Sequence, residues 1–220
     1  RHGFARNNDF DLVEKGENFL KFKFSSNEET LEKYPFEFDF FLIYTITDNG
    51  LEIKYEVLNK TKGDMYFSLG AHPAFALELN DEIKLEDYYL EFEKNENAQI
   101  YQLRSDALIL EEKKDYLKNE KIIKLSGTIF DNDAIIFENL NSAKVTLKCS
   151  KSTRELSMDY SQFPFITFWS KSKAPFVCIE PWFGISDFAN CTGKLEEKKG
   201  ILKLKENDVF TAKIMINGKL

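Results

Sequence analysis

The sequence predicts an all-β protein that folds as a large antiparallel β-sandwich with few short helices. Short runs rich in Phe, Tyr, Ile and Val recur along the 220 residues, and many alternate apolar with polar side chains. Turn-forming residues separate the runs, and the sequence shows no amphipathic helical pattern between them. Strands that follow one another without crossover helices favour antiparallel pairing over a βαβ fold.

The strongest local signal is a hairpin formed by residues 36–47 and 51–58. Between these two runs, Asp48, Asn49 and Gly50 supply residues that tolerate positive φ, as a tight turn requires. Further strands are expected over residues 64–70, 88–92, 99–103, 121–125, 134–137, 143–149, 155–160, 165–169, 176–180 and 209–216. The one helix expected spans residues 26–33, with Ser26 as its N-cap. We interpret the charged runs 111–121 and 194–199 as solvated loops.

The composition bounds the function. A net charge of -7 with scattered Lys argues against nucleic acid as a partner. The sequence contains no run of about 18 apolar residues, so it predicts no membrane-spanning helix. The three cysteines lack metal-ligand spacing, so we expect no metal and no cofactor, and free thiols in the cytoplasm. We expect one domain over residues 1–220, and the start at Arg1 predicts a missing upstream segment.

Two histidines occur in the chain, within the segments HGFAR and GAHPAF. An imidazole with a pKa near 6.5 can donate or accept a proton near neutrality. Pro73 biases His72 toward an extended backbone and removes a ladder donor, so we expect the strand to end there and the ring to point out of the sheet. Taken alone, this motif favours a partly buried, hydrogen-bonded structural role for His72 over a catalytic one.

Two acidic segments accompany these histidines. In CIEPWFGISD, Glu180 ends an apolar run, where burial raises the pKa of a carboxyl toward a value suited to a general base. Trp182 follows, and its flat face is of the kind on which sugar C–H surfaces stack. Asp131 and Asp133 precede another apolar run, although turn chemistry alone explains acids there.

The segments HGFAR, GAHPAF and CIEPWFGISD, in this order, resemble the aldose 1-epimerase (galactose mutarotase-like) family, and in particular its uncharacterised bacterial mutarotase-like branch. The resemblance covers nearly the whole chain. It implies a galactose mutarotase-like supersandwich, with further strands before the first motif that this chain lacks, and a sugar cleft on one face.

The resemblance also implies roles for individual residues. His72 is expected to be the general acid that protonates the ring oxygen, and Glu180 the general base that takes the proton from the anomeric hydroxyl. His2 and Arg6 are expected to contact the sugar. Asp133 is expected to hold ring hydroxyls, with Asp131 as its rival, and Trp182 to form a wall of the cleft.

The expected function is therefore an isomerase that interconverts the α and β anomers of an aldose by acid–base ring opening and closure. The expected partner is a small sugar, and the sequence does not indicate an oligomeric state. A hexose-6-phosphate 1-epimerase is an alternative, because Arg1 and Arg6 offer donors for a phosphate. A non-catalytic carbohydrate-binding sandwich is another. A glycosidase is disfavoured, since the partner of Glu180 is a histidine and not a second carboxylate.

Overall fold

The computed structural model describes residues 2–219, and nearly all of its regular secondary structure is strand. Its first half contains the 3₁₀-helix η1, the α-helix α1 and seven strands. Their bounds are η1 Phe4–Asn7, β1 Asp11–Lys15, β2 Phe19–Ser25, α1 Glu28–Lys33, β3 Phe38–Thr47, β4 Gly50–Asn59, β5 Met65–Phe67, β6 Leu69–Gly70 and β7 Ala74–Ala76.

The second half contains two further 3₁₀-helices and nine strands. Their bounds are η2 Leu85–Asp87, β8 Tyr88–Leu103, β9 Ile109–Lys124, β10 Ile135–Glu138, β11 Lys144–Cys149, β12 Glu155–Asp159, β13 Phe165–Trp169, β14 Phe176–Phe183, η3 Leu195–Glu197, β15 Leu202–Leu204 and β16 Val209–Lys219. No helix within residues 2–219 combines the length and the apolar character that a membrane crossing would need.

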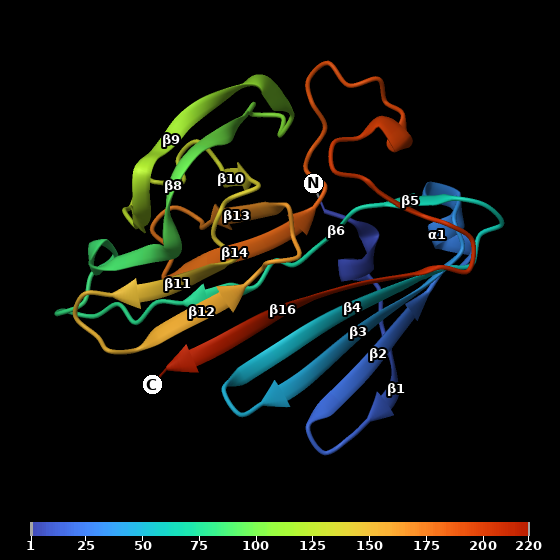
Figure 1. Ribbon diagram of the computed structural model, residues 1–220, viewed down its shortest axis with the longest axis horizontal. Helices are drawn as coiled ribbons and strands as arrows, with labels where there is room; N and C mark the ends of the chain where they lie inside the picture. The colour runs from blue at the N-terminus through green and yellow to red at the C-terminus, as the bar shows by residue number, and fades with distance from the viewer. Residues whose placement is uncertain (1, 220) are drawn as a thin grey trace.

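One long antiparallel sheet dominates the described chain. Its strands follow the order β1-β2-β3-β4-β16-β12-β11-β8-β10-β13-β14-β6, with β9 beside β8 and β7 beside β14. Figure 1 shows β1 to β4 and β16 fanned out on one side of the molecule, and β8, β9, β10, β13 and β14 on the other. The expected all-β antiparallel fold is confirmed.

Aromatic side chains from both parts of the sheet meet in the core. Tyr55 of β4 lies edge-on to Phe163, with ring centroids 6.4 Å apart, and Phe163 packs in turn on Phe183 of β14 at 4.6 Å. Strand β13 is buried over Phe165–Phe168, as expected of an inner strand covered on both faces. The core therefore holds β13 and β14 rigidly, and these are the strands that carry the site.

The predicted hairpin is confirmed, but its glycine is required for a reason other than a positive φ. Strands β3 and β4 pair from Phe38 opposite Asn59 to Thr47 opposite Gly50, which leaves a two-residue turn. Neither Asp48, Asn49 nor Gly50 has a positive φ. A Cβ added to Gly50 would lie 1.9 Å from the Ile216 carbonyl oxygen, so this position needs glycine because β16 approaches it closely.

Two local predictions were wrong. Ser26 is not the cap of α1: the side chain of Asn27 accepts a hydrogen bond from the Thr30 N–H at 2.9 Å and forms a capping box. The charged run 111–121 is not a loop, because it lies inside β9, where most of its side chains face solvent across an exposed strand. An outer strand hides little apolar surface and therefore shows a weak hydrophobic pattern.

Candidate active site

Strand β14 presents Cys178, Glu180 and Trp182 on one face, because side chains two residues apart on a strand point the same way. On one side of β14 lies β13, with Thr167 paired opposite Glu180. On the other side, β6 and β7 pair with the two ends of β14, and the link between them, residues 71–73, is irregular but stays hydrogen-bonded to β14 through Ala71 N–H to the Pro181 carbonyl and Ile179 N–H to the Pro73 carbonyl. The chain therefore stays beside β14 at Glu180, although residues 71–73 are not regular strand.

His72 lies in this link. Gly70 pairs with Trp182 and Ala74 with Cys178, so the same register places His72 opposite Glu180. The His72 Nδ1 atom is 3.1 Å from the Glu180 Oε1 atom. The Glu180 side chain is 5% exposed and that of His72 is 38% exposed, so the imidazole connects a buried carboxyl with solvent.

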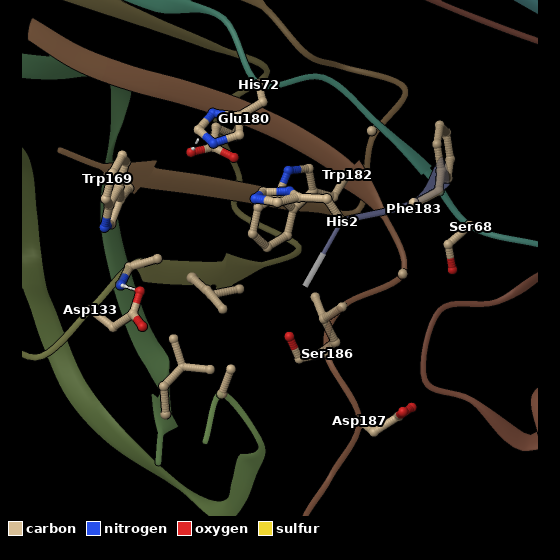
Figure 2. Close-up of a pocket in the computed structure, with 18 of the residues that line it drawn as sticks. His2, Ser68, His72, Asp133, Trp169, Glu180, Trp182, Phe183, Ser186 and Asp187 are labelled. Carbon is tan, nitrogen blue, oxygen red and sulfur yellow. Dashed lines mark hydrogen bonds and ion pairs between the residues drawn. The ribbon is translucent and has the colours of Figure 1, made fainter. Parts of the chain in front are cut away.

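A cavity of about 660 Å³ opens over this pair. Figure 2 shows His72 and Glu180 together at one end, with Trp169 and Asp133 along one side and Ser186 and Asp187 at the far end. The cavity is of the size that small-molecule sites usually have.

Burial is the main influence on the Glu180 carboxyl and raises its pKa to about 8. A side-chain hydrogen bond from Trp182 acts in the opposite direction, and the negative charge of Asp133 raises the pKa further. The pKa of His72 is lowered, first by burial and then by the positive charge of Arg6. Between the two pKa values, the pair therefore holds a single exchangeable proton.

Aromatic rings flank the pair. His72 stacks on His2 with ring centroids 5.5 Å apart, and it lies edge-on to Trp169 at 6.1 Å. Trp169 and Trp182 are both partly buried and both line the cavity. Such rings offer flat apolar surfaces beside a group that exchanges protons.

Asp133 lines the cavity, whereas its rival Asp131 is exposed and lies outside the lining. Asp133 has φ +73°, an uncommon backbone conformation for a residue with a side chain. Its carboxylate accepts a hydrogen bond from the Ala134 N–H at 2.9 Å, which holds it at the start of β10.

The two residues expected from the first motif take different positions. His2 lines the cavity, and Arg6 does not. Arg6 is exposed in η1 and influences the site through its charge, which lowers the pKa of His72. Arg1 lies outside the described residues.

The sequence pattern did not indicate several residues of the site. Trp169, Ser68 and Lys198 line the cavity from separate segments, and only the folded sheet brings them together. Cys178 lies beside the pair, and burial raises the pKa of its thiol to about 12, so the thiol is neutral. For Trp169, the only sequence signal of a place in the site was its position at the end of the apolar run 165–169.

The antiparallel fold and the cavity define a β-sandwich protein with a carboxyl–imidazole pair at the end of a small-molecule-sized cavity. The family model described as aldose 1-epimerase matches residues 1–206, and the chain belongs to this family. Membership confirms the resemblance seen in the three motifs and supports a sugar epimerase or mutarotase kind of function.

Relatives with known sequence or structure agree with this assignment. The chain is 36% identical to the chromosomal protein LacX of Lactococcus lactis subsp. lactis over 208 residues, which is 93% of this chain and 70% of LacX. A galactose mutarotase related enzyme from Lactobacillus acidophilus superimposes with a TM-score of 0.93 at 32% identity, over 100% of this chain and 74% of that one. For a galactose mutarotase-like protein from Lactobacillus casei, the TM-score is 0.92 at 30% identity, over 100% and 76%.

Proposed function

We propose that this protein interconverts the α and β anomers of a free aldose by acid–base ring opening and closure. The observation that carries the proposal is the contact of 3.1 Å between His72 Nδ1 and Glu180 Oε1 at the end of a cavity that could admit a sugar. Family membership supports the same kind of reaction.

The reaction moves two protons in concert. Glu180 takes the proton from the anomeric hydroxyl O1, and His72 gives a proton to the ring oxygen O5 while the C1–O5 bond breaks. Rotation about C1–C2 then exposes the other face of the carbonyl. On closure O5 attacks C1, His72 recovers its proton from O5, and Glu180 returns one to O1. Each residue ends in its starting state, so no external acid or base is consumed.

The active form has the single proton of the pair on His72. Burial favours a second form, in which Glu180 holds the proton and His72 is neutral. The two forms contain the same number of protons and differ only in where the proton lies. A sugar hydroxyl that donates to Glu180 would favour the ionised carboxylate, because hydrogen bonds to the charged form lower the pKa.

The other residues of the cavity would position the sugar. Asp133 offers a carboxylate acceptor to ring hydroxyls, and Trp182 and Trp169 offer apolar faces. Within the described lining, Lys198 is the one Lys or Arg, and its Nζ atom is 2.5 Å from Asp187 Oδ1. This ion pair favours a neutral sugar over a phosphorylated one.

Polarimetry on α-glucose and α-galactose tests the proposal. We expect Glu180→Gln and His72→Asn each to lower the catalysed rate by about 10²–10⁴-fold, the usual contribution of general acid–base catalysis. Asp131→Asn is the matched control, since Asp131 is exposed and outside the cavity, and should keep the wild-type rate. Equal rates for all four proteins would exclude catalysis by the pair. Saturable sugar binding in calorimetry without any rate above that of water would indicate a binding protein instead.

A further inference from the structure

A third donor atom lies beside the acid–base pair. One ligand atom each from His72, Cys178 and Glu180 lies within 4.8 Å of the other two. Cys178 and Glu180 are two residues apart on β14 and share a face, and His72 lies opposite in the link between β6 and β7. No metal-ligand spacing is visible in the sequence, because His72 is far from the other two residues along the chain.

The donor set is selective. An imidazole nitrogen, a thiol sulfur and a carboxylate oxygen together are the three ligand types that Zn²⁺ uses in proteins. Ca²⁺ and Mg²⁺ prefer oxygen ligands alone, so a site with one sulfur and one nitrogen disfavours them.

The geometry is close to that of a three-ligand zinc site. Zn–S bonds of about 2.3 Å and Zn–N and Zn–O bonds of about 2.0–2.2 Å place tetrahedral ligand atoms roughly 3.2–3.6 Å apart. The His72 and Glu180 atoms, at 3.1 Å, already approach this separation. The His72 side chain is 38% exposed, so its ring has room to rotate and close the remaining gap to the sulfur.

We propose that His72, Cys178 and Glu180 bind one Zn²⁺, and that this ion reversibly inhibits the enzyme by occupying its acid–base pair. The inhibition rests on the proposed function, whereas the binding does not. The ion displaces the thiol proton and the single proton of the His72–Glu180 pair to solvent, so that a thiolate, a neutral imidazole and a carboxylate are its ligands. Two of the three ligands, His72 and Glu180, line the cavity, from which a water can complete the tetrahedron.

Binding is measured on the metal-free protein without any sugar. Zn²⁺ is titrated in competition with a chromophoric chelator, and Co²⁺ is added separately as a spectroscopic probe of sulfur ligation. The variants are Cys178→Ser and His72→Asn, with Cys149→Ser and Cys191→Ser as controls because both other thiols are free and lie outside the cluster. His72 is half-exposed, so its variant tests the site even if Cys178→Ser fails to fold.

We expect one Zn²⁺ per chain and a thiolate-to-cobalt absorption band in the wild type and in both controls. Cys178→Ser should lose the band, and both site variants should bind Zn²⁺ at least about tenfold more weakly. Undiminished Zn²⁺ affinity in His72→Asn, or no stoichiometric binding to the wild type, would overturn the proposal. Mutarotation is assayed separately with a chelator present, so a missing metal site and a missing isomerase activity give different results. Inhibition by Zn²⁺ that a chelator reverses would complete the evidence.

Discussion

His72 Nδ1 and Glu180 Oε1 lie 3.1 Å apart although one residue belongs to an irregular link and the other to an inner strand. The strand pairing on either side of the link sets this distance, since β6 and β7 are in the same register with β14. The pair is therefore positioned by backbone hydrogen bonds of the sheet.

The pair predicts a bell-shaped dependence of the mutarotation rate on pH. Below the lowered pKa of His72 both groups are protonated and no base remains, so the rate falls as the pH decreases through that value. Above about 8, the pKa of Glu180, both are deprotonated and no acid remains. Polarimetry from pH 4 to pH 10 checks this, after subtraction of the buffer-catalysed rate. A rate that rises steadily past the upper limit would contradict a shared proton.

Asp133→Asn should move the alkaline limit to lower pH. Burial is the main cause of the raised pKa of Glu180, and the negative charge of Asp133 adds to it, so the neutral amide leaves the ionised carboxylate more stable. The pH profile of kcat reports the shift. The matching variant Asp131→Asn, on the exposed side of the same turn, should leave the limit unchanged.

Arg6→Gln should move the acidic limit of the pH profile to higher pH. Burial is the main cause of the lowered pKa of His72, and the charge of Arg6 lowers it further, so removal of that charge raises the pKa. An NMR titration of the His72 ring measures this directly. Arg154→Gln serves as the control, because Arg154 is ion-paired with Glu78 outside the cavity. An unchanged His72 titration in Arg6→Gln would show that Arg6 has no electrostatic influence on the site.

Gly70→Ala should disturb the cavity wall. A Cβ at Gly70 would lie 2.5 Å from Trp182 Cδ1, so the indole must shift from its place beside Glu180. We expect a raised KM for the sugar and a loss of about 1–3 kcal/mol in the free energy of unfolding, as overpacking usually costs. In Gly127→Ala the new Cβ meets nothing within 4 Å, and neither quantity should change by much. Chemical denaturation and initial rates measure both.

Thr167→Val should stabilise the protein. Thr167 is fully buried opposite Glu180, and its hydroxyl has no hydrogen-bond partner among the described residues. A buried polar group without a partner is destabilising, so its replacement by a methyl group of similar shape should raise the free energy of unfolding by about 1 kcal/mol. Destabilisation on urea unfolding would show that the hydroxyl makes a favourable contact in solution.

Apolar alternation located most of the sheet correctly, because β3, β4, β11 and β13 each bury at least one face. It missed β1, whose five residues are all exposed, because a strand that buries nothing leaves no hydrophobic period. Strands β8 and β9 are longer than predicted, since register shifts let them continue through charged residues.

The motifs located His72 and Glu180, but not their neighbours. Trp169 and Cys178 reach the site through the pairing of β13 with β14, where they lie opposite each other. Register between distant strands depends on the whole core, and a single motif does not contain that information.

The position of Glu180 on an inner strand also bears on how such a protein could acquire new substrates. The far end of the cavity is formed by Ser186 and Asp187 after β14 and by residues 106–108 between β8 and β9, all outside the strands that hold the pair. Loops accept substitutions and insertions more readily than paired strands do. Changes there can alter which sugar enters while the proton-transfer geometry stays fixed, so the chemistry and the specificity of this fold are free to evolve separately.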